Sequence, residues 1–146
     1  FILLKKGQID SLHIENSKQR TTPYIYTLIC FGFWCYFLRV TMHLPHIWLF
    51  IAIGATIALA IVMLINHWWK ISAHLTGMGG LLGGICSMAL FYTMLPSALI
   101  ISVLIISLLL MHARLYTNAH TPMQVVSGYL LGILCTFIPN LIIYYA

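Results

Sequence analysis

Two short segments of the sequence carry ionisable side chains at spacings that favour anion binding. The first runs from Lys70 through Ser72 to His74, and the second places Arg114 six residues before His120. Only 6% of the chain is charged, so these groups stand out against an apolar background. Ionisable residues in such surroundings are energetically costly and commonly functional. An ammonium group, a guanidinium and two imidazoles together suit an anionic head group.

Both segments lead into a predicted helix start. Ser72 is a candidate N-cap, because its hydroxyl can accept a bond from a free backbone N–H. Thr121, Pro122 and Gln124 match a capping box, with threonine at N-cap, proline at N1 and glutamine at N3. Free N–H groups and the positive end of each helix dipole favour a nearby anion. A structural reading stays open, since every helix start needs caps and interfacial His, Trp and Lys can anchor a helix.

The composition places these segments in a membrane protein. Of 146 residues, 62% are hydrophobic, and Asp10 and Glu15 are the two acidic residues. Five apolar runs approach the roughly 20 residues that a spanning helix needs; they cover about 23–40, 47–65, 76–94, 97–111 and 125–146. We therefore predict an all-α, polytopic membrane helical bundle. It would be one domain over residues 1–146, with five transmembrane helices in this sequence and one more in an N-terminal part that precedes residue 1.

Short connections between the runs make successive helices antiparallel. The polar segment 5–23 and the connections after the second and fourth runs should then share one membrane face. That face would hold six of the seven basic residues: Lys5, Lys6, Lys18, Arg20, Lys70 and Arg114. Arg39 would lie opposite. Either the positive-inside rule or a basic pocket for an anionic head group explains this bias, so the orientation stays undetermined.

Two further patterns are interpreted as structural. The segment 76–84, TGMGGLLGG, places small residues four apart, which allows close approach of a neighbouring helix. Such packing would also hold His74 rigidly. The four cysteines lie in apolar runs without a CxxC or Cys/His cluster, which predicts buried thiols and no metal site.

The polar segments resemble motifs of a known family. Arg114-x5-His120-x3-Gln124 resembles the third motif, S-R-x5-H-x3-D, of the type-2 phosphatidic-acid phosphatase and haloperoxidase superfamily. Ser72-Ala73-His74 resembles the second motif, P-S-G-H, and precedes the third in the same order. The resemblance extends from about residue 18 to residue 135, which is most of the chain.

The first family motif, K-x6-R-P, is matched least well. Lys18, Arg20 and Pro23 follow one another in the right order but at a different spacing. The position seven residues before Arg20 holds His13 in place of lysine. Ala113 and Ala73 also replace a serine and a glycine of the other two motifs.

The resemblance implies a membrane phosphatase that acts on lipid phosphates or pyrophosphates without a metal or cofactor. His120 would be the nucleophile and form a phosphohistidine, His74 would protonate the leaving oxygen, and Arg114 would clamp the phosphoryl group. Further phosphate ligands would be Arg20, Lys18, Lys70 and Ser72. The expected partners are a lipid substrate and the bilayer of a bacterial inner membrane, with no nucleic acid.

Gln124 stands where the family motif has the aspartate that orients the nucleophilic histidine. An amide oxygen can accept the same hydrogen bond, but it supplies no charge for the imidazolium. The predicted capping box would also compete for this amide. One alternative is therefore a non-catalytic relative that serves as a subunit or lipid-binding component of a membrane complex. Another is a haem or quinone protein that uses paired histidines.

Overall fold

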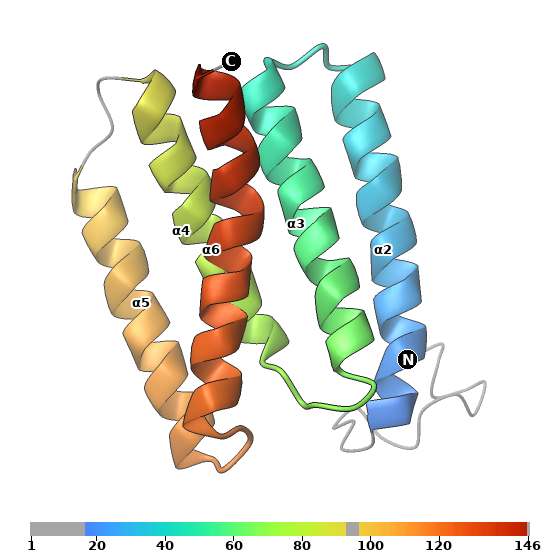
Figure 1. Ribbon diagram of the computed structural model, residues 1–146, viewed down its shortest axis with the longest axis vertical. Helices are drawn as coiled ribbons and strands as arrows, with labels where there is room; N and C mark the ends of the chain where they lie inside the picture. Colours follow the sequence, from blue (N-terminus) through green and yellow to red (C-terminus); the bar gives the residue numbers. More distant parts are fainter. Residues whose placement is uncertain (1–16, 93–96, 146) are drawn as a thin grey trace.

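Five long helices make up the described part of the chain (Figure 1). The structure is a computed structural model that describes residues 17–92 and 97–145, with side chains from residue 22 onward. The helices are α2 (Ser17–Val40), α3 (His46–Ile65), α4 (Ala73–Phe91), α5 (Ser97–Tyr116) and α6 (Pro122–Tyr145). All five are long and apolar enough to cross a membrane. The predicted all-α membrane bundle is confirmed; the additional N-terminal helix lies outside the described residues.

The helices extend further into the polar segments than the apolar runs suggested. Helix α4 begins at Ala73, so His74 is already in its first turn, and α5 continues to Tyr116, so Arg114 is helical. Backbone hydrogen bonding continues through these polar residues, because the end of a helix is set by its capping or turn residues and not by the end of an apolar run. Helix α2 likewise begins at Ser17, six residues before the predicted run.

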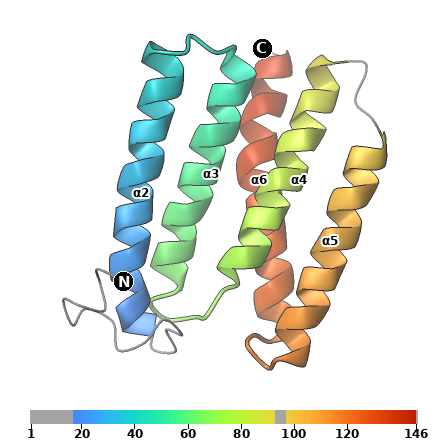
Figure 2. The same cartoon turned by 180° about the vertical axis from the view of Figure 1, so that it is seen from behind.

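Helices α2, α3, α4 and α5 lie in a row in chain order, and α6 packs across one side of this row (Figures 1 and 2). The most extensive packing joins α6 to α4, followed by that of α6 to α3. The start of α2, the 66–72 connection and the 117–121 connection all lie at the lower end in Figure 1. This agrees with the common face expected from helix parity.

Glycines let α4 and α6 meet backbone to backbone. A Cβ atom added at Gly79 would overlap the carbonyl oxygen of Tyr129, and one at Gly132 would overlap that of Thr76. A Cβ at Gly128 would lie 2.6 Å from the carbonyl oxygen of Ser72. Such contacts require shifts in the backbone if a side chain is added, so glycine permits this close approach. The close packing predicted from the glycine-rich segment is confirmed.

Polar side chains reinforce the same interface at membrane depth. Thr136 of α6 donates its hydroxyl to the carbonyl of Gly80, at 3.0 Å. The Ser87 hydroxyl of α4 is shared between the carbonyl of Gly83 in its own helix, at 2.8 Å, and that of Thr136 in α6, at 3.2 Å. Hydrogen bonds between helices of this kind stabilise membrane bundles. The α4–α6 pair is therefore the rigid frame that positions both polar segments.

Candidate functional site

The connection between α5 and α6 begins with a Schellman motif. The N–H of Ala119 donates to the carbonyl of Arg114 at 3.1 Å, and that of Asn118 donates to Leu115 at 3.0 Å. Asn118 has a φ of 52°, in the left-handed region that glycine and asparagine tolerate best. These bonds satisfy carbonyls at the end of α5 and turn the chain towards α6.

A capping box then begins α6, as predicted. The N–H of Thr121 donates to Oε1 of Gln124 at 3.0 Å, and the N–H of Gln124 donates to the hydroxyl of Thr121 at 3.4 Å. Pro122 occupies the first helical position. His120 is thus the one residue between the Schellman motif and the N-cap. Its backbone is fixed from both sides.

The ring of His120 is held by a main-chain carbonyl. Its Nδ1 lies 3.1 Å from the carbonyl oxygen of Lys70, in the connection between α3 and α4. A carbonyl oxygen only accepts, so Nδ1 carries the hydrogen and the neutral ring has its lone pair on Nε2. The structure thus places the Lys70 carbonyl at the ring nitrogen for which Gln124 was predicted, while the Gln124 amide caps α6.

An open pocket of about 540 Å³ lies at this end of the bundle. Its walls come from the 66–72 connection, the end of α5 and the start of α6: Lys70, Leu115, Asn118, Ala119, His120, Thr121, Pro122 and Gln124. Lys70 supplies positive charge, and the α6 dipole adds to it. The capping box already engages the N–H groups of Thr121 and Gln124, so Lys70 is the principal source of charge in the lining.

The start of α4 touches this region through its backbone. The N–H of Ser72 donates to the main-chain carbonyl of Gln124, at 3.2 Å, which links the two helix starts directly. Ser72 occupies the N-cap position, but its hydroxyl makes no capping bond, so the predicted bond is wrong. Within the described residues this fully buried hydroxyl has no hydrogen-bond partner. The close approach of Gly128 fixes the Ser72 backbone against α6, with an extended φ of −85° and ψ of 99°.

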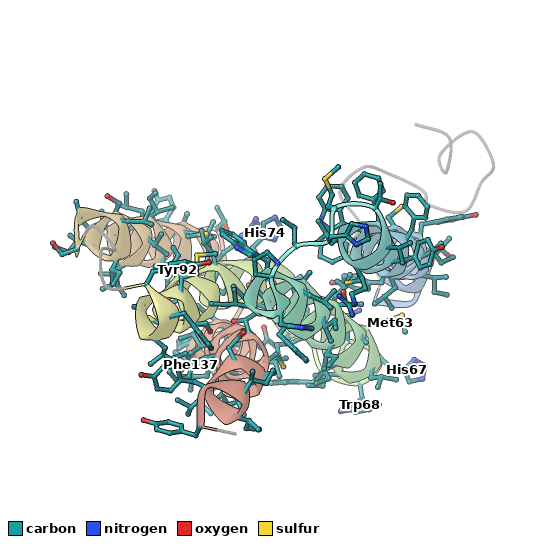
Figure 3. The ribbon with its side chains drawn as sticks, turned by 90° about the horizontal axis from the view of Figure 1, so that it is seen from above. Met63, His67, Trp68, His74, Tyr92 and Phe137 are labelled. Carbon is teal, nitrogen blue, oxygen red and sulfur yellow. The ribbon has the colours of Figure 1, made fainter. Side chains whose placement is uncertain are left out.

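His74 lies on a different side of α4. It is exposed, whereas Thr76 and Gly79 are buried against α6. Figure 3 shows His74 on the side of α4 away from α6. His74 is not in the lining of the His120 pocket. The structure therefore does not bring the two predicted catalytic histidines together in that pocket.

The predicted cations are distributed unevenly around the pocket. Lys70 lines it, whereas Arg114 lies half-buried in the last turn of α5 beside the lining residue Leu115. The Nε atom of Arg114 is buried and has no hydrogen-bond partner in the described part of the chain. Lys18 and Arg20 belong to the first turns of α2, and their side chains lie outside the description.

Two contributors were missed by reasoning from the sequence. The Lys70 carbonyl is a main-chain group, so the type of residue at position 70 gives no sign that this carbonyl pairs with His120. Asn118, by contrast, carried a recognisable signal, because asparagine just after a helix is suited to a left-handed C′ position.

Comparisons with protein-family models, curated proteins and solved structures found no match.

Proposed function

We propose that this protein is a membrane phosphatase that hydrolyses a phosphate or pyrophosphate group of a lipid, with His120 as the nucleophile. The observation that carries the proposal is the hydrogen bond from His120 Nδ1 to the Lys70 carbonyl at a pocket lined by Lys70. A fixed tautomer and a nearby cation are what a phosphoryl-accepting histidine requires. The expected location is a bacterial inner membrane.

The proposed reaction has two steps. In the first, Nε2 attacks phosphorus in line, the bond from phosphorus to the leaving oxygen breaks, and a phosphohistidine forms. In the second, water attacks the phosphohistidine, releases phosphate and restores the neutral ring. The Lys70 carbonyl holds the Nδ1 hydrogen throughout. Because this acceptor is uncharged, it stabilises the developing imidazolium less than a carboxylate would, and we expect modest turnover.

The placement of His74 favours a particular leaving group. With His74 on the other side of α4, the pocket lining does not contain the acid predicted to protonate the leaving oxygen. An alkoxide leaving from a monoester needs that proton more than a phosphate leaving from a pyrophosphate, because phosphate is the weaker base. We therefore expect lipid pyrophosphates to be hydrolysed faster than lipid phosphate monoesters.

The test is phosphate release by the purified protein in detergent, in the presence of a metal chelator. A polyprenyl pyrophosphate and phosphatidate are the paired substrates, and acid-labile phosphate bound to the protein is measured in parallel. His120→Ala should reduce turnover by at least about a thousandfold, as removal of a nucleophile does, and should abolish the bound phosphate. His112→Ala, which removes an exposed histidine from the same end of α5, is the control. Retained turnover in His120→Ala would refute the assignment.

A second candidate function is a non-catalytic subunit or lipid-binding component of a membrane complex. The separation of His74 from the His120 pocket and the use of Gln124 as a cap favour it. In that case both substrates would remain intact at any concentration of the purified protein. Turnover that disappears in His120→Ala would exclude this alternative.

A further inference from the structure

A second hollow, of about 340 Å³, lies between α2, α3 and α4. It shares no lining residue with the His120 pocket. Its lining is mostly apolar or small and includes Phe31, Ala55, Leu59, Ala73, Gly77 and Leu81. We call this hollow the α2–α4 groove.

The two threonine hydroxyls of the groove already donate their hydrogens to main-chain carbonyls. Thr27 donates to the carbonyl of Pro23 at 2.8 Å, and Thr76 donates to that of Ser72 at 3.0 Å. Both bonds are made within the residue's own helix or its cap. An occupant of the groove therefore meets an apolar wall, and hydrophobic burial is what favours its binding.

The groove runs from the cationic end of the bundle into the membrane. On α4 it begins at Ala73, the first helical residue, and reaches Leu81, which is about 12 Å at the helical rise per residue. Exposed His74 lies beside its lower end. Of the basic residues in the described ranges, Lys18, Arg20, Lys70 and Arg114 belong to this end and Arg39 to the other.

We propose that the α2–α4 groove binds one hydrocarbon chain of an anionic membrane lipid, whose head group lies at the His74 end. The apolar lining of the groove along α2, α3 and α4 favours a hydrocarbon chain as its occupant. The charge at the lower end complements an anionic head group. This binding does not depend on any reaction at His120.

Glycine positions provide a matched pair of variants. A Cβ added at Gly77 meets no atom within 4 Å, so the side chain of Gly77→Leu starts in open space and extends into the groove. Gly32 of α2 has the same open space and does not line the groove, so Gly32→Leu is the control. Gly77→Ala adds a single methyl group and should give an intermediate effect.

The experiment uses the protein in phosphatidylcholine nanodiscs that contain phosphatidate with a photoactivatable group on its acyl chain. Crosslinks are mapped by mass spectrometry. We expect labelling at Phe31, Leu59 and Leu81, and its loss in Gly77→Leu but not in Gly32→Leu. An uncharged photoactivatable diacylglycerol should label these residues less.

Several outcomes would overturn the proposal. Labelling of the groove that is unchanged in Gly77→Leu, or no stronger than on the exposed face of α5, would mean that only surrounding lipid was detected. Equal labelling by diacylglycerol would remove the anionic head group from the proposal. A dimer that native mass spectrometry detects, and that Gly77→Leu dissociates, would identify a second copy of the chain as the occupant.

Discussion

The start of α6 and the start of α4 lie side by side at one end of the bundle, yet they are built differently. A Schellman motif and a capping box hold the chain on both sides of His120. At the start of α4 the N-cap hydroxyl of Ser72 is buried and makes no capping bond. The same kind of sequence signal, a hydroxyl residue before an apolar run, thus gave two local structures.

The difference lies in what surrounds each cap. Thr121 is exposed at the end of the bundle, where its hydroxyl is free to turn towards the Gln124 N–H. Ser72 is enclosed by α6, with Gly128 packed against its carbonyl. Tertiary packing thus overrides local capping preference at α4. The exposed start of α6 keeps its local capping bonds, whereas the backbone and side chain at the enclosed start of α4 are positioned by contact with α6.

The largest expected effect is a difference in turnover between the His120→Ala and His74→Ala variants. If His120 alone is the nucleophile, His120→Ala should lower turnover by at least about a thousandfold. His74→Ala should lower it less than about tenfold, because His74 lies outside the pocket lining and general-acid catalysis by a positioned group is worth about a hundredfold or more. Phosphate release from a polyprenyl pyrophosphate measures both. An equal loss of turnover in the two variants would mean that the starts of α4 and α6 contribute to the same catalytic site.

The next effect concerns the contact between the two helix starts. Gly128→Ala brings a Cβ to 2.6 Å from the Ser72 carbonyl, and such overpacking costs about 1–3 kcal/mol. Gly77→Ala, in the open space on the other side of α4, should stabilise by up to about 1 kcal/mol through helix propensity. Thermal unfolding in detergent distinguishes them. Equal midpoints for the two variants would contradict the close contact.

A smaller effect tests the turn before α6. Asn118→Ala should destabilise by about 1–2 kcal/mol, because alanine disfavours the left-handed conformation. Asn118→Gly should preserve the wild-type midpoint to within a few tenths of a kcal/mol, since glycine adopts this φ readily. The same unfolding assay applies. If alanine is tolerated as well as glycine, the positive φ is not maintained in the membrane.

The smallest effects compare the two caps directly. Thr121→Ala removes an existing capping bond and should cost about 1 kcal/mol. Ser72→Ala removes a buried hydroxyl that has no partner in the described residues, so stability should stay level or rise slightly. Unfolding midpoints again provide the measurement. A loss in Ser72→Ala as large as that in Thr121→Ala would show that the Ser72 hydroxyl forms a capping bond.

Much of this architecture was predictable from the sequence. Hydropathy located the five helices, and the Thr-Pro-x-Gln pattern located the cap of α6, because both depend on residue type alone. The side of α4 on which His74 lies could also be predicted in part. At 100° per residue, His74 lies opposite Gly83, so a glycine face packed on α6 directs His74 away from it.

Other features depended on tertiary structure. The unbonded hydroxyl of Ser72 results from its enclosure by α6, and nothing in the local sequence distinguishes it from a working N-cap. The partner of His120 is a carbonyl from a connection 50 residues away. Every residue has such a carbonyl, so only the packing of the two connections determines which one accepts the bond.

The hydrogen bonds from Ser72 to Gln124 and from His120 to Lys70 both end on main-chain carbonyls. Any amino acid at positions 70 and 124 provides that acceptor, and any amino acid except proline at position 72 provides the donor. These two bonds therefore set the spacing between the two helix starts independently of the side chains at positions 70 and 124, whereas the enclosed side chain at position 72 has to stay small. Such a frame can acquire, weaken or lose a catalytic group by single substitutions without first having to be rebuilt.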